Sequence, residues 1–202
     1  MYSVPMALVD FVPVILFGIA AVIMQRDFYE KMSKGVFALF AAGTIDVFMA
    51  GFLKALYKLL FALGVCDFQP LTQMFFPVQA IGFLLAGIAA TRMLAESRKG
   101  TKLMAAAPPF AGTFIFVTLM VLGLGAMDLS LARIARRMKK GLALALFVAS
   151  FVLCLMMGYL SSKDFTQSYM NWAAELVNLL GQGSLLWGVM ILHRAGLADE
   201  LN

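Results

Sequence analysis

Residues 141–160 read GLALALFVASFVLCLMMGYL, a run without a single charged side chain. A helix needs about 20 mostly apolar residues to cross the hydrocarbon core of a membrane. Because lipid offers the backbone no hydrogen-bond partner, such a run must satisfy its own backbone groups as a helix. A transmembrane strand would alternate polar and apolar residues instead. This stretch therefore predicts an all-α integral membrane protein.

Five further stretches have the same character, so the sequence predicts six transmembrane helices at about 6–25, 35–61, 73–93, 108–128, 141–160 and 172–193. The linkers are short and carry most of the charge. They leave no room for a soluble domain, so residues 1–202 are expected to form a single transmembrane helical domain. The first ten residues contain an acid and no base, unlike a cleaved signal peptide, so the first span is expected to remain. The expected location is a cell membrane, either the bacterial inner membrane or a plasma membrane.

The overall composition excludes several classes of protein. Of the 202 residues, 62% are hydrophobic and 13% are charged, which does not fit a water-soluble globular domain. One His and two Cys cannot build a metal centre, a His-dependent catalytic triad or a disulfide framework within one copy. No Gly-rich phosphate loop is present. We therefore expect no metal, no cofactor and no enzyme, unless Asp46 and Glu175 converge as paired carboxylates.

Two sequence matches suggest an internal repeat. The segment Lys31–Gly35 (KMSKG) opens the second span, and Arg137–Gly141 (RMKKG) opens the fifth. Asp67-Phe68 and Asp164-Phe165 each precede the next span. The matches predict a three-helix unit used twice, although shared membrane composition is the alternative explanation. Because three crossings invert the copy that follows, a 3+3 inverted repeat is expected.

The distribution of basic residues does not fix the orientation of six spans. With alternating crossings, one side receives Arg26, Lys31, Lys34, Arg92, Arg98, Lys99, Lys102 and Lys163, and the other receives Arg133, Arg136, Arg137, Lys139, Lys140 and Arg194. A re-entrant hairpin at 108–128 would bring both basic loops to one side, and insertion in both orientations would favour antiparallel dimers. We expect six full spans with the N-terminus outside.

The linker 129–140 has the pattern of an amphipathic surface helix. Leu131, Ile134, Ala135 and Met138 share one apolar face. Its basic residues are predicted to contact anionic lipid headgroups: Arg133, Arg136, Arg137, Lys139 and Lys140. A loop that only sets the topology is the alternative. Because this contact explains the net charge of +5, no nucleic-acid partner is expected.

A polar stripe in the last span is the strongest functional signal. Asn171, Glu175, Asn178 and Gln182 follow at offsets of 0, 4, 7 and 11, which places them on one face of a helix. Gln79 of the third span aligns with Asn178 at a shift of 99 residues. We expect these five side chains to form a substrate site near the bilayer midplane; interhelical hydrogen bonding is the alternative.

Ionisable residues elsewhere in the spans receive different interpretations. Asp46, near the middle of the second span, is expected to face the bundle interior and to couple or gate transport together with Glu175. Lys54 and Lys58 are expected to reach the interface, Asp10 to lie solvated at headgroup level, and Asp128 to cap the surface helix.

These patterns favour a transporter or channel for a small polar or charged solute. The alternative is a non-catalytic membrane subunit, ligand-capture module or sensor that works with a partner protein. The expected partners are membrane lipids, including anionic ones, the small-molecule solute, and either a second copy of the chain or a partner membrane subunit.

Overall fold

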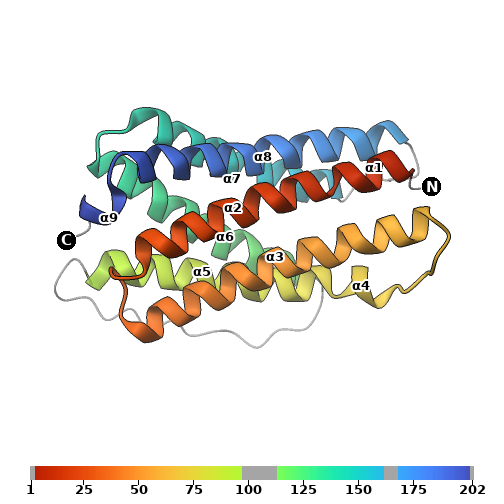
Figure 1. The fold of residues 1–202 in the computed structure, drawn as a ribbon, viewed down its shortest axis with the longest axis horizontal. Coiled ribbons are helices and arrows are strands. Elements are labelled where there is room, and N and C mark those ends of the chain that lie inside the picture. The colour runs from red at the N-terminus through yellow and green to blue at the C-terminus, as the bar shows by residue number, and fades with distance from the viewer. Residues whose placement is uncertain (1–2, 97–112, 162–167, 201–202) are drawn as a thin grey trace.

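The structure is a computed structural model that describes residues 3–96, 113–161 and 168–200. Every long element in these ranges is a helix (Figure 1). The helices are α1 (Val4–Val9), α2 (Phe11–Phe28), α3 (Lys34–Ala62), α4 (Pro70–Gln73), α5 (Phe75–Glu96), α6 (Thr113–Arg137), α7 (Gly141–Ser161), α8 (Ser168–Arg194) and α9 (Leu197–Glu200).

Five segments are long and apolar enough to span a membrane: Val4–Phe28, Lys34–Ala62, Pro70–Ala95, Ile115–Arg137 and Met170–Arg194. The apolar stretch of α7, Gly141–Met157, is shorter, and α7 lies alongside the others (Figure 1). The helical membrane bundle expected from the sequence is therefore confirmed. The first span is divided at Asp10 into α1 and α2, and Pro13 lies in the first turn of α2, where a missing backbone N–H costs nothing.

The six long helices form a ring in chain order. Each of α2, α3, α5, α6 and α7 packs against the next long helix along the chain, and α8 returns to pack against α2. The hydrophobic core runs through this ring and includes Phe40, Ala86, Met127, Phe147 and Leu185. A ring of helices has an interior surface to which every member contributes, and this surface positions the site described below.

The two three-helix halves have the same orientation, so the expected inverted repeat is wrong. Helices α5 and α6 are adjacent and parallel: Gly123 of α6 lies against Phe83 and Leu84, and Ala126, farther along α6, lies against Gly87, farther along α5. Three spans alone would invert the second half. Here α5 ends and α6 begins at opposite ends of the bundle, and residues 97–112 between them lie outside the described residues.

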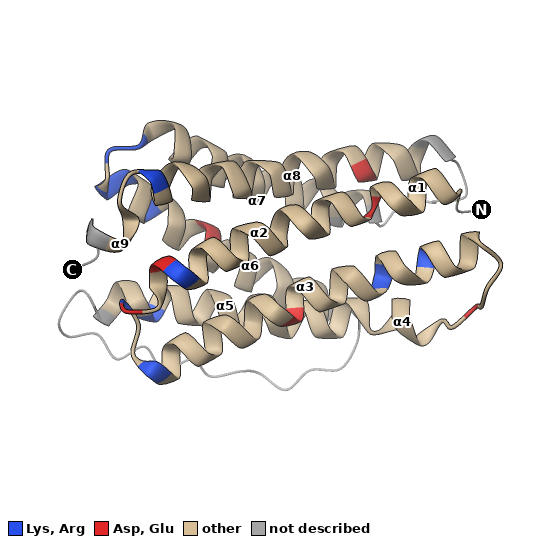
Figure 2. Ribbon diagram, in the orientation of Figure 1, with Lys and Arg blue, Asp and Glu red and all other residues tan. Residues whose placement is uncertain are grey.

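The helix ends also show where the basic residues of the described ranges lie. Helix α6 is continuous over Thr113–Arg137, so a re-entrant hairpin at 108–128 is wrong for the described part of that range. Yet Lys and Arg gather at one end of the bundle, where α2, α5, α6 and α8 end and α3 and α7 begin (Figure 2). The basic residues at this end are Arg26, Lys31, Lys34, Arg92, Arg133, Arg136, Arg137, Lys139, Lys140 and Arg194; we call it the basic end.

The expected surface helix at 129–140 is also wrong. Residues 129–137 continue α6, and its apolar face packs into the bundle, where Leu131, Ile134 and Ala135 are buried. The amphipathic pattern was correct, but a core of protein covers the apolar face instead of lipid. Asp128 consequently caps nothing. It lies within α6, buried beside the buried Ser150 hydroxyl of α7.

Candidate functional site

A pocket of about 380 Å³ lies inside the ring, and all six long helices line it. We call it the central pocket. It occupies the half of the bundle opposite the basic end: its lining begins near Met6 and Lys58 and reaches Phe17, Phe83 and Gln182 about halfway along their helices. Its volume lies within the range of small-molecule binding sites, about 300 to 1,000 Å³.

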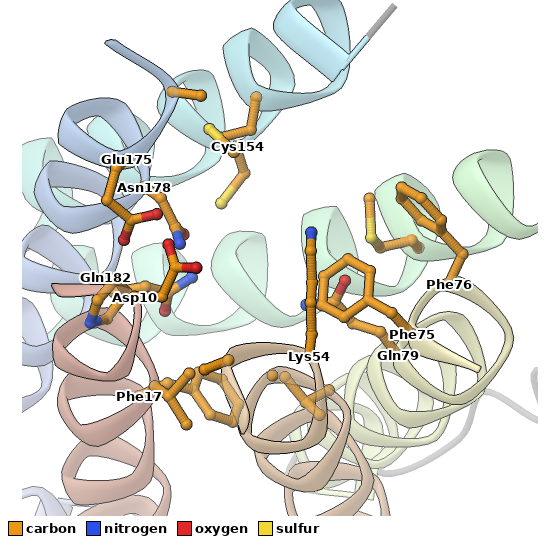
Figure 3. Close-up of a pocket in the computed structure, with 18 of the residues that line it drawn as sticks. Asp10, Phe17, Lys54, Phe75, Phe76, Gln79, Cys154, Glu175, Asn178 and Gln182 are labelled. Atoms are coloured by element: carbon orange, nitrogen blue, oxygen red, sulfur yellow. The ribbon is translucent and has the colours of Figure 1, made fainter. Parts of the chain in front are cut away.

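The structure brings all five sequence-predicted binding residues to this pocket. Asn171, Glu175, Asn178 and Gln182 line it from α8, and Gln79 lines it from α5. Figure 3 shows Asn178 and Gln182 beside Glu175, and Gln79 across the pocket beside Phe75. The helical spacing carried this prediction, because a period of 3.6 residues turns the four α8 side chains to one face.

Three charged residues that the sequence interpretation placed at the membrane surface also line the pocket. Asp10 is only 6% exposed and makes an ion pair with Lys58, so the expectations of a solvated acid and of a lysine at the interface are both wrong. The break between α1 and α2 places Asp10 at the pocket wall. Lys54 and Lys58 are four residues apart near a helix end, a pattern that fits either an inward position or side chains that reach the membrane interface. The sequence signal that was missed is Asp10, an acid at the same depth in the first span as Lys58 in the second.

Lys54 also turns inward. Its Nζ atom lies 3.8 Å from the centre of the Phe75 ring and 5.9 Å from that of Phe76. Among the described residues, no carboxylate lies within 4.0 Å of this ammonium. An aromatic face attracts a cation through its quadrupole and so partly compensates for the missing counter-ion.

Two buried oxygens on α8 have no hydrogen-bond partner in the described part of the chain. They are Oε1 of Glu175, a residue only 7% exposed, and Oε1 of Gln182. Leaving a buried acceptor unsatisfied costs about 1 to 3 kcal/mol. The carboxyl group of Asp10 lies next to that of Glu175 (Figure 3). The wall formed by α8 and Asp10 therefore presents hydrogen-bond acceptors and two neighbouring carboxyl groups.

Asp46, the other residue expected to couple or gate, is not among the residues that line the pocket. It is half-buried, and its Cβ lies where α3 crosses Gly82 of α5. Asp46 and Glu175 therefore do not form a pair of carboxylates in the pocket. The acid that accompanies Glu175 there is Asp10.

The interior of the ring toward the basic end is packed, although a second pocket between α2 and α3, lined by Gly18 and Thr44 among others, opens at the outer surface of the bundle. Below the pocket, Met24, Phe40, Leu185, Val189 and Leu192 are buried in the core. At the basic end itself, Asp27 of α2 pairs with His193 of α8. The pocket thus ends against an apolar barrier instead of continuing through the ring.

The five residues expected at the lipid surface are all exposed at the basic end: Arg133, Arg136, Arg137, Lys139 and Lys140. Their placement is compatible with headgroup contact, which stays a prediction. No group of three or more His, Cys, Asp or Glu side chains that could hold a metal ion occurs among the described residues. Comparisons with protein-family models, with curated proteins and with solved structures found no match for this chain.

Proposed function

We propose that this protein is a transporter for a small polar or charged solute, with its substrate site in the central pocket. The observation that carries the proposal is the polar pocket walled by six apolar helices. Charged and amide side chains inside a membrane bundle are costly, and they are retained where they meet a solute, an ion or water.

The closed half of the bundle favours a transporter over an open channel. A channel needs a continuous path, whereas the pocket stops at the buried core formed by Leu185, Val189 and their neighbours. Transport across this barrier requires the halves of the bundle to rock so that the pocket opens toward the other side. Two three-helix units in one orientation, α2–α3–α5 and α6–α7–α8, would supply the moving parts, and we include six spans and this parallel repeat in the proposal.

The charge distribution supports an orientation. Cytoplasmic loops carry an excess of Lys and Arg, so the basic end would face the cytoplasm and the pocket would face outward. The N-terminal segment then lies outside, in a cell membrane. The exposed cations of the basic end would contact anionic lipid there.

Within the pocket, we assign the coupling role to Glu175 together with Asp10. The two carboxyl groups are neighbours, and of these two only Asp10 has an ion-pair partner among the described residues, Lys58; this arrangement favours uptake of a proton or cation at Glu175 when the site is dehydrated. Asp46, outside the pocket, would instead act in packing between α3 and α5.

The test is solute uptake into liposomes that contain the purified protein. The liposomes are exposed to a mixture of amino acids, nucleosides, sugars, organic ions and metal ions, and their contents are compared with those of protein-free liposomes. Accumulation of a solute that is lost in Glu175→Gln and kept in Glu30→Gln, an exposed acid away from the pocket, supports a transporter. Binding of a solute without accumulation would contradict transport and favour the alternative, a non-catalytic ligand-capture subunit or sensor that works with a partner protein or a second copy.

A further inference from the structure

We infer that the solute of the central pocket is a zwitterion, a molecule that carries both an ammonium and a carboxylate group on an apolar body. This inference rests on the proposed function and deepens it. It comes from the placement of Lys54 and Glu175 on opposite walls of the pocket (Figure 3).

The acidic wall selects for hydrogen-bond donors. Oε1 of Glu175 and Oε1 of Gln182 are buried acceptors on one face of α8, seven positions apart in the chain, and neither has a partner within the described residues. An ammonium group offers three donors and a positive charge, so it suits either of these oxygens as a partner. Asp10 pairs with Lys58 and also contacts the Glu175 carboxyl group, so Oε1 of Glu175 is the carboxyl atom on α8 that remains for a donor of the ligand.

The opposite wall selects for an anion. Lys54 of α3 points into the pocket with its ammonium over the Phe75 ring, and no carboxylate of the described residues forms an ion pair with it. Gln79 beside it adds two amide donors. A carboxylate placed here would receive hydrogen bonds from Lys54 and Gln79, which gives this half-buried cation the ion-pair partner that it lacks among the described residues.

The floor between the two walls is apolar. Phe17 and Phe83 meet edge to face with their ring centres 6.0 Å apart, and Met120 and Leu124 of α6 complete the surface. This surface favours an apolar substituent and offers little to a sugar, whose hydroxyl groups would lie against carbon without partners. A solute with one charge, by contrast, would leave either Lys54 or Glu175 uncompensated.

The test measures ligand-induced thermal stabilisation of the purified protein with matched sets of compounds. Leucine, phenylalanine and leucylleucine are each compared with their C-terminal amides, which lack the carboxylate, and their N-acetyl forms, which lack the ammonium. We expect at least one zwitterion to bind, and either block to weaken its binding by at least about tenfold. Comparison of the single amino acids with the dipeptide reports the charge separation that the pocket prefers.

Two variants assign the ends of the ligand. Glu175→Gln should remove the preference for the zwitterion over its N-acetyl form and keep the preference over its amide; Lys54→Gln should do the reverse. The matched controls Glu30→Gln and Lys34→Gln change exposed charges away from the pocket and should alter neither preference. The compound series on the unmodified protein remains decisive if a variant fails to fold.

The inference is wrong if blocked forms bind as well as the zwitterions, or if none of the zwitterions stabilises the protein. Uptake of a neutral or singly charged solute in the liposome assay would overturn this inference and leave the transporter intact. Absence of uptake for every solute would instead count against the proposed function.

Discussion

Asp27 and His193 are separated by 166 positions, yet Nδ1 of His193 lies 2.8 Å from Oδ1 and 3.0 Å from Oδ2 of Asp27. The contact joins the first and the last span at the basic end. Asp27 is 4% exposed, whereas the His193 side chain is 40% exposed. The imidazole is thus the partner that water reaches, and it satisfies an otherwise buried carboxylate while closing the ring of helices.

Substitution of His193 by Leu should destabilise the protein. The Asp27 carboxylate would stay buried without its partner, which costs about 1 to 3 kcal/mol. The melting temperature of the protein in detergent is the measurement. Arg194→Gln, which changes the exposed neighbouring cation, should have no such effect. In a double-mutant cycle, adding Asp27→Leu to His193→Leu should recover part of the loss; strict additivity would contradict a direct interaction.

Lys58→Met should destabilise the protein more than the double variant Asp10→Asn/Lys58→Met. Removing one partner of a buried ion pair leaves the other charge uncompensated, which costs about 3 kcal/mol or more, whereas removing both avoids that penalty. Unfolding in denaturant compares the variants. Equal stability of the single and the double variant would mean that Asp10 is already neutral or solvated without Lys58.

Gly123→Ala should disrupt the seam between the two halves. A Cβ at this position would collide with the backbone of Phe83 and Leu84, which cannot move aside as a side chain could. We expect loss of folded protein or a fall of several degrees in melting temperature. Gly183→Ala is the matched control, since nothing lies within 4 Å of its Cβ position in α8 and Ala favours the helix by about 0.5 to 1 kcal/mol. If both variants behave alike, the backbones of α5 and α6 do not meet at Gly123.

The common orientation of the two halves can be tested by thiol labelling in intact cells. In a chain lacking both native cysteines, Lys34→Cys and Lys140→Cys introduce exposed thiols at the start of α3 and just before α7. A membrane-impermeant reagent should modify both only after the cells are permeabilised. In a separate chain that keeps Cys66 and lacks Cys154, the Cys66 thiol, which is exposed near the other end, should react without permeabilisation. Opposite behaviour of positions 34 and 140 would restore the inverted arrangement.

The sequence predicted the features that depend on local periodicity. Apolar runs revealed the spans, and the spacing of Glu175, Asn178 and Gln182 predicted one shared face. The structure places that face on the central pocket. Even the buried face of residues 129–137 was correct as a pattern, since Leu131 and Ile134 do lie on the covered side.

Long-range partners could not be read from the sequence in the same way. The depth at which Asp10 meets Lys58 depends on how α1 and α3 pack, and an acid near a helix start fits headgroup contact equally well. The relative orientation of the two halves depends on the ends of the bundle at which α5 ends and α6 begins. The apolar composition of a span does not reveal in which direction the span crosses the membrane. For the same reason, His193 gave no sign that its partner lies in the first span.

The thiol of Cys154 lies on the pocket wall contributed by α7 (Figure 3) and therefore provides a native chemical probe of access to the pocket. With Cys66 replaced by Ser, Cys154 is the one sulfhydryl left in the chain. Its alkylation rate would then record how often the cavity admits a small reagent, and a resident solute would slow that rate by shielding the sulfur. The half-life of Cys154 alkylation thus measures how much of the time the pocket is occupied, and it does so without knowledge of which solute occupies it.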